Sequence, residues 1–184
     1  MEIRPADWDS FAQVMGEKGG CGGCWCMLWR STRKDFDANK GDGNRAAMAR
    51  VFAAERPPGL VGILEGQAVG WIQIAERAAF PALERSRILK PVDAVPVWSV
   101  ACFLVDKAHR KSGISVALLD AACDFAATHG ALAVEGYPVE PTKTPYPAVY
   151  AWTGLARTFE RAGFTEIARR SPTRPIMRKV LPAD

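Results

Sequence analysis

Residues 98–129 constrain the fold more than any other part of the chain. Residues 98–106 are rich in aromatic and β-branched side chains and carry no charge before Asp106, which predicts a buried central strand. Residues 114–129 place apolar side chains at helical spacing, and Gly130 fits the residue after a helix C-terminus. A buried strand that leads through a short turn into an amphipathic helix predicts an α/β arrangement.

The turn between this strand and this helix has the composition of an anion-binding site. It contains Arg110, Lys111, Ser112, Gly113 and Ser115. Backbone N–H groups at a helix start lack intrahelical partners, and the helix dipole adds partial positive charge there. Glycine lets the backbone approach an anion closely, and the basic side chains add donors. The turn therefore suits a pyrophosphate, although its spacing matches neither a Walker A loop nor a GxGxxG fingerprint. The alternative is an ordinary turn with exposed basic residues.

The rest of the chain predicts further helices and strands around this unit. Of the 184 residues, 48% are hydrophobic and 24% are charged, which is typical of one soluble globular domain over residues 1–184. Apolar spacing and turn residues predict helices at 7–17, 44–55, 81–89 and 150–162, hairpin strands at 60–65 and 68–76, and strands at 131–134, 165–169 and 175–181.

Charge and cysteine content exclude several classes of protein. The net charge of +4 is too small to indicate a nucleic-acid partner. The longest nearly apolar run, 94–105, is shorter than the roughly 20 residues of a membrane helix, so no membrane partner is expected. The first residues do not resemble a signal peptide, and the five cysteines are odd in number. We therefore expect a cytoplasmic protein with free thiols.

Two motifs together resemble the GNAT superfamily of N-acetyltransferases. Arg110, Gly113 and Ser115 follow the Arg-x-x-Gly-x-small pattern of motif A in that family, with serine as a small departure at the last place. The sequence Phe-Glu-Arg-Ala-Gly-Phe at 159–164 is similar to the family's Tyr-Glu-Lys-Leu-Gly-Phe ending. The resemblance implies a single α/β (α+β) domain, with a mixed, mostly antiparallel sheet flanked by helices and with splayed central strands.

The resemblance also implies the donor and the residues that bind it. The donor would be acetyl-CoA, although a larger acyl group stays open, and the acceptor would be an amine. Its pyrophosphate would lie on Arg110, Lys111, Ser112, Gly113, Ile114 and Ser115. The pantetheine arm would pair with the backbone of Phe103, Leu104 and Val105. Many members of the family form dimers, so a homodimer stays open beside a monomer.

The catalytic residues are less well marked. The family often has a tyrosine acid where this chain has Phe159, so either no acid is used or another residue serves. Tyr150 is then the first candidate acid, ahead of Tyr137 and Tyr146. Some members have a glutamate base where this chain has Ser99, which is no base at neutral pH. Glu135 is the first candidate base and Glu76 the second.

Residues 19–30 form a segment rich in glycine, cysteine and tryptophan. A structural zinc site needs four ligands, and Cys21, Cys24 and Cys26 have no second cysteine pair, so no metal is expected. We expect a shaped loop in which Trp25 or Trp29 forms a wall of the acceptor pocket. Two other functions stay open: a coenzyme A-binding regulatory module with weak catalysis, and a thiol-based metal or redox protein that uses the three cysteines.

Overall fold

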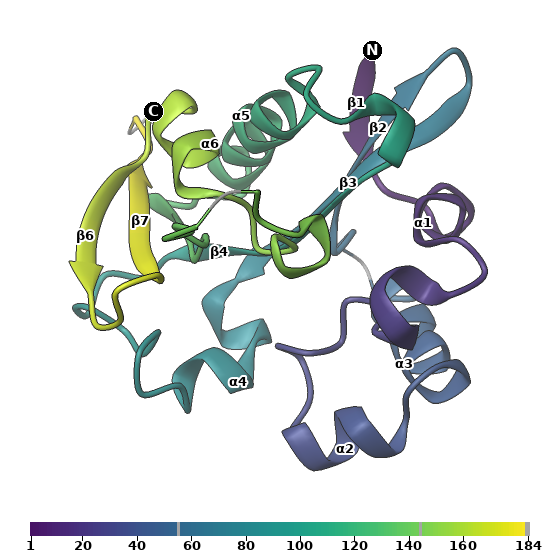
Figure 1. The fold of residues 1–184 in the computed structure, drawn as a ribbon, viewed down its shortest axis with the longest axis horizontal. Helices are drawn as coiled ribbons and strands as arrows, with labels where there is room; N and C mark the ends of the chain where they lie inside the picture. Colours follow the sequence, from purple (N-terminus) through teal and green to yellow (C-terminus); the bar gives the residue numbers. More distant parts are fainter. Residues whose placement is uncertain (55, 144, 183–184) are drawn as a thin grey trace.

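A computed structural model describes residues 1–54, 56–143 and 145–182. Its strands form one seven-stranded sheet in the order β1-β2-β3-β4-β5-β7-β6 (Figure 1). Every neighbouring pair is antiparallel except β4 and β5, which are parallel. The predicted mixed, mostly antiparallel sheet is thereby confirmed. The strands are β1 (Glu2–Pro5), β2 (Gly59–Leu64), β3 (Gln67–Glu76), β4 (Trp98–Val105), β5 (Ala133–Gly136), β6 (Thr165–Arg169) and β7 (Pro175–Val180).

Helices cover both faces of the sheet, because alternate side chains of β3 and β4 are apolar on both sides. α5 and α6 cover one face, and α1 and α3 pack on the other (Figure 1). None of the described helices is long and apolar enough to cross a membrane. The helices are α1 (Trp8–Met15), α2 (Arg33–Ala38), α3 (Asp42–Phe52), α4 (Pro81–Glu84), α5 (Ile114–Ala127) and α6 (Ala156–Arg161), with the short helical turns η1 (Gly19–Gly23), η2 (Arg77–Ala79), η3 (Lys107–His109) and η4 (Ala148–Tyr150).

The two central strands separate soon after they meet. β4 pairs with β5 only from Trp98 to Val100, while β4 itself runs on to Val105. A Cβ on Gly136, the last residue of β5, would collide with the buried ring of Phe159. Glycine is therefore needed where the strands diverge, and the predicted splay is confirmed.

Several element boundaries differ from the prediction. α6 begins at Ala156 instead of residue 150, because Gly154 has φ of 86° and the backbone before it cannot continue a helix. Tyr150 lies in the separate turn η4. β5 is shifted two residues toward the C-terminus, from 131–134 to Ala133–Gly136. Two elements were missed: the short edge strand β1, and α2, which Thr32 caps by accepting a hydrogen bond from the Asp35 amide.

Candidate functional site

A cavity of about 990 Å³ lies beside the C-terminal half of β4, where β5 has turned away. Four segments meet around it: the end of β4, the turn that leads into α5, residues 146–158, and the glycine- and cysteine-rich residues 20–29. The predicted cofactor turn and the predicted acceptor loop, which are about 90 residues apart in the sequence, therefore face the same space.

One wall of the cavity is basic. Gly113 is the N-cap of α5 with φ of 87°, and a Cβ placed on it would meet no atom of the described residues within 4 Å. The space beside this helix start is therefore open, as an anion site requires. Arg110 and Lys111 line the cavity beside this turn, and Arg157 and Arg161 of α6 add two further cations.

The turn is held in shape by its own side chains. The Asp106 carboxylate accepts hydrogen bonds from the Ala108 amide at 3.1 Å and from Nδ1 of His109 at 2.8 Å. The contact with His109 and the backbone N–H groups lower the pKa of Asp106. Nε of Arg110 donates to the Val105 carbonyl at 3.1 Å, which fixes the guanidinium beside the end of β4.

Most of the predicted cofactor residues line this cavity: Phe103, Leu104, Val105, Arg110, Lys111, Gly113, Ile114 and Ser115. Ser112 is the exception. Its hydroxyl donates to the His109 carbonyl at 2.5 Å, so its side chain stabilises the turn.

The free edge of β4 presents backbone groups to the cavity. The amide of Asp106 donates to Val69 of β3 at 2.8 Å, so alternation along the strand turns the amides of Phe103 and Val105 away from β3. The Phe103 amide donates to the carbonyl of Trp152 at 2.6 Å. Residues near Trp152 therefore occupy part of the edge that β5 leaves open.

The part of the lining that includes the cysteines also contains a polar residue that we did not predict. Gln73 of β3 lines the cavity with 0% exposure, and neither its amide oxygen nor its amide nitrogen has a hydrogen-bond partner among the described residues. Its cross-strand neighbour is Cys102, which also lines the cavity. Gln73 is the one strongly polar residue within the apolar run 68–75, and this isolation was the signal that could have identified it.

Cys26 and Cys102 form a buried thiol pair. Sγ of Cys26 lies 3.1 Å from Sγ of Cys102 and accepts a hydrogen bond from Nε1 of Trp71 at 3.3 Å. The contact with Cys26 and burial raise the pKa of Cys102, and burial raises the pKa of Cys24. Cys24 and Cys102 are therefore neutral thiols at physiological pH. The described residues contain no cluster of three or more histidine, cysteine or acidic side chains that could hold a metal ion.

The two predicted tryptophans have different positions. Trp29 lines the cavity, with its ring centroid 5.7 Å from that of Trp152. Trp25 is only 6% exposed and stacks on Trp8 at 5.9 Å, and it does not line the cavity. The prediction of Trp25 as a pocket wall is wrong, because positive φ at Trp25 turns its side chain into the core beneath α1.

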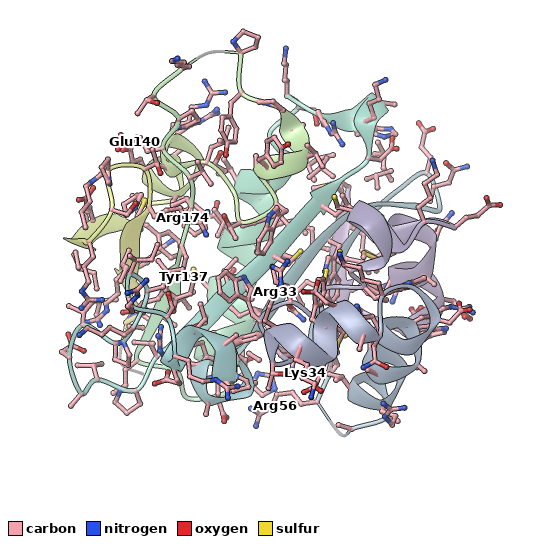
Figure 2. All side chains as sticks on the ribbon, turned by 60° about the horizontal axis from the view of Figure 1, so that its bottom comes forward. Arg33, Lys34, Arg56, Tyr137, Glu140 and Arg174 are labelled. Atoms are coloured by element: carbon pink, nitrogen blue, oxygen red, sulfur yellow. The ribbon has the colours of Figure 1, made fainter. Side chains whose placement is uncertain are left out.

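Glu135 lies outside the cavity, in a buried polar network. Its carboxylate is 1% exposed and accepts from Arg178 at 2.7 Å, from the hydroxyl of Tyr137 at 3.1 Å and from Arg77 at 3.5 Å. Ser99 joins the network through the Tyr137 hydroxyl at 2.8 Å. Tyr137 is fully buried, and Figure 2 labels it beside the central strands.

This network corrects the assignment of the base. A carboxylate held by two guanidinium groups and away from the cavity cannot accept the proton of an amine there, so we withdraw the prediction for Glu135. Glu76 pairs with Arg56 at 2.8 Å on the surface and does not line the cavity either. Tyr137 is buried in the same network and does not line the cavity, which excludes it as the acid; burial also raises the pKa of its hydroxyl.

Of the remaining candidates for the acid, Tyr150 lines the cavity and is 60% exposed. Tyr146 lines it too, with ring centroids of the two tyrosines 6.3 Å apart. Phe159 is fully buried, with its ring 5.8 Å from that of Phe103, and it packs beneath β4 outside the cavity.

Comparisons with known proteins agree with this architecture. The model of the Acetyltransferase (GNAT) family matches residues 25–144, which is more than half of the chain. No curated protein sequence matches the chain.

Solved structures of low sequence identity share the fold. An acetyltransferase of the GNAT family from Listeria monocytogenes 4b F2365 is 13% identical, with 98% of this chain and 94% of that chain covered and a TM-score of 0.61. An aminoglycoside 6'-acetyltransferase type Ii is 14% identical over 100% of both chains, with a TM-score of 0.56. Ard1 from Thermoplasma volcanium is 15% identical over 99% and 98%, with a TM-score of 0.55.

Proposed function

The chain belongs to the GNAT acetyltransferase family, and we propose that it transfers an acetyl group from acetyl-CoA to an amine by direct attack on the thioester. One observation carries this proposal: a single cavity joins the open helix start at Gly113, the free edge of β4, and the wall formed by Gln73 and the cysteines. A donor bound along β4 would place its thioester between the anion site and that wall.

The residues present fit a coenzyme A pyrophosphate. Gly113 leaves room at the start of α5, and Arg110 and Lys111 supply cations at the same turn. The outward amide of Val105 would pair with the extended pantetheine arm as a neighbouring strand does.

In the reaction, the lone pair of a neutral amine attacks the thioester carbonyl carbon and the carbon–sulfur bond breaks. The nitrogen loses a proton as the amide forms, and the thiolate takes up a proton to leave as coenzyme A. The developing negative charge on the carbonyl oxygen needs a donor, and the backbone amide of Phe103 is the group we assign to it. Because the Trp152 carbonyl holds this amide, binding of the donor requires that bond to be exchanged.

Proton transfer at the two ends of the reaction uses different groups. We assign protonation of the departing thiolate to Tyr150, whose exposed side chain lines the cavity. No carboxylate is among the described residues that line the cavity, and His109, whose Nδ1 lies 2.8 Å from the Asp106 carboxylate, is the lining side chain that could accept the proton of the amine.

Substitution of Gly113 tests the proposal. Gly113→Val places a branched side chain where the pyrophosphate would lie, and we expect acetyl-CoA affinity, measured by calorimetry, to fall at least ~10-fold, about 1.4 kcal/mol. Gly66→Val is the matched control, because Gly66 also has positive φ (79°) and open space around its Cβ but lies in the β2–β3 turn.

If folded Gly113→Val protein binds acetyl-CoA as tightly as the parent does, this turn is not part of the binding site. Release of thiol from acetyl-CoA that depends on an added amine separates an enzyme from a coenzyme A-binding regulatory module. Acetyl-CoA binding without transfer to any amine would favour the regulatory alternative.

A further inference from the structure

The unpartnered amide of Gln73 indicates what kind of acceptor the cavity takes, if the proposed acetyl transfer is correct. A buried polar group without a partner is costly, and a ligand that supplies the partner removes that cost. The side chain offers an oxygen that accepts and a nitrogen that donates two hydrogen bonds. A ligand group that has an N–H next to a carbonyl satisfies both, as a carboxamide or peptide bond does.

A second unpartnered donor lies on the same cavity. The indole Nε1 of Trp29 is buried and has no hydrogen-bond partner among the described residues. An indole N–H only donates, so it adds a requirement for an acceptor atom in the ligand, such as a carbonyl oxygen. Both unpartnered groups belong to residues that line the cavity, and no carboxylate lines it.

The charge of the cavity disfavours a polycationic acceptor. The charged side chains among its described lining residues are Arg110, Lys111, Arg157 and Arg161, all of them basic. The donor's phosphates would pair with these cations, and a ligand with several ammonium groups would find no carboxylate counter-ion in the lining. The acceptor should therefore bring little positive charge beyond the attacking amine.

Because no carboxylate is among the described residues that line the cavity, we expect the acceptor to carry an amine that is easily deprotonated. An α-amino group has a pKa of about 7.7–8.0, whereas the alkylamine of lysine has about 10.4. Near neutral pH the neutral fraction of the α-amine is therefore more than ~100-fold larger. A site whose described lining offers one imidazole and no carboxylate works best on an amine that is already largely neutral.

The wall around Gln73 is apolar. Met15, Leu28 and Phe36 line the cavity on the side of the sheet that carries α1, together with Trp29 and the neutral thiol of Cys102. These side chains favour an aliphatic or aromatic group on the ligand.

We infer that the acceptor is an α-amino amide, a primary α-amine next to a carboxamide or peptide bond, with an apolar side chain. The amide binds Gln73, the apolar side chain lies against the wall beneath α1, and the α-amine attacks the thioester. This chemistry occurs in free amino-acid amides and at peptide N-termini.

A panel of four amines tests this inference with the full chain and acetyl-CoA. Phenylalaninamide carries every proposed feature, phenylalaninol lacks the carbonyl, spermidine is a polycation, and the tripeptide Phe-Gly-Gly presents a peptide N-terminus. Rates are measured from pH 7 to pH 9.5 and expressed per neutral amine, which removes differences in amine pKa. We expect kcat/KM for phenylalaninamide to exceed that for phenylalaninol at least ~10-fold and that for spermidine at least ~100-fold. A higher kcat/KM for the tripeptide than for phenylalaninamide would indicate a peptide acceptor, and a lower one would indicate a small amide.

Gln73→Met is the test of the residue itself, because methionine has similar length and no amide. We expect this variant to lose the preference for phenylalaninamide over phenylalaninol through a higher KM, while its affinity for acetyl-CoA stays within about 2-fold of the parent. Gln67→Met is the matched control: Gln67 is exposed at the start of the same strand. A preference that survives in Gln73→Met would overturn the assignment of Gln73.

Failure of this inference is distinguishable from failure of the proposed function. Equal transfer to spermidine or phenylalaninol would overturn the acceptor class and leave acetyl transfer intact. Absence of acetyl-CoA binding would overturn the proposed function. Calorimetric titration of the protein–coenzyme A complex with phenylalaninamide reports recognition without turnover; we expect binding that weakens at least ~10-fold in Gln73→Met, and no binding at millimolar amide would overturn the inference.

Discussion

The backbone amide of Phe103 donates to the carbonyl oxygen of Trp152 over 2.6 Å, on the edge of β4 that β5 leaves free. The segment around Trp152 is anchored from behind. Thr153 is fully buried, and its hydroxyl accepts a hydrogen bond from Arg174 at 3.1 Å. Burial lowers the pKa of Arg174. The chain thus fills its own open strand edge with a carbonyl, the same kind of group that the proposed thioester would bring.

Exchange of this bond should be visible in tryptophan fluorescence. If the acyl carbonyl takes the Phe103 amide, Trp152 must shift relative to Trp29, whose ring centroid is 5.7 Å away. We expect acetyl-CoA to change the emission of the parent protein and the change to be largely lost in Trp152→Phe, which keeps the backbone carbonyl. Trp98→Phe is the control, because Trp98 lies in the core outside the cavity. A full response in Trp152→Phe would show that the segment does not move.

The N-terminus of α1 should make stability depend on pH. The Asp7 carboxylate accepts from the Ser10 amide at 2.8 Å and from Arg4 at 2.6 Å, and these contacts lower its pKa to about 2. At neutral pH we expect Asp7→Ala to lower the free energy of unfolding by about 1 kcal/mol, as loss of an N-cap does. A carboxylate whose pKa is lowered by folding stabilises the folded protein fully at pH values above its ordinary pKa of 3.8. The difference between parent and variant should therefore shrink as the pH falls from 3.8 toward 2.

Urea unfolding at neutral and acidic pH measures this effect. Asp9→Ala serves as the control, since Asp9 lies in the first turn of the same helix but is not the N-cap. A difference that stays constant down to acidic pH would mean that the Asp7 charge does not contribute.

Local sequence patterns predicted the parts of the site that are contiguous in the chain. The strand 98–106 and the helix 114–129 correspond to β4 and α5, and Gly113 has the positive φ that its place in the turn requires. Periodicity and capping act over a few residues, so they can be read directly from the sequence.

Contacts between distant segments were not predictable in this way. Glu135 follows a strand signal, but its partners Arg77 and Arg178 are 58 and 43 residues away, and only the folded sheet brings them together. The direction of Trp25 depends on positive φ in residues that ordinarily avoid it, which no propensity indicates.

The role of Glu135 can be separated from catalysis by measuring stability. We expect Glu135→Gln to lower the free energy of unfolding by about 1–3 kcal/mol, because Arg77 and Arg178 lose a buried acceptor but keep Glu84 and Asp93 as partners. Because Glu135 does not line the cavity, the acetyl-CoA affinity of the folded protein should stay close to that of the parent. Urea unfolding and calorimetry measure the two quantities. A stable variant with turnover reduced more than ~100-fold would restore Glu135 as the base.

Tyr150→Phe tests the acid that we assign to the departing thiolate. The substitution removes only the hydroxyl of an exposed side chain that lines the cavity, so folding and coenzyme A affinity should change little. General acid catalysis contributes roughly 10²–10⁴-fold, but a thiol has a pKa of about 8.5 and leaves readily without full protonation. We therefore expect kcat to fall about 10- to 100-fold, with the loss smallest at low pH, where water supplies the proton more easily. Tyr146→Phe is the matched control, since Tyr146 lines the same cavity and its ring lies 6.3 Å from that of Tyr150. A large loss of coenzyme A affinity in Tyr150→Phe would make Tyr150 a binding residue, and an equal loss of kcat in both variants would remove it as the specific acid.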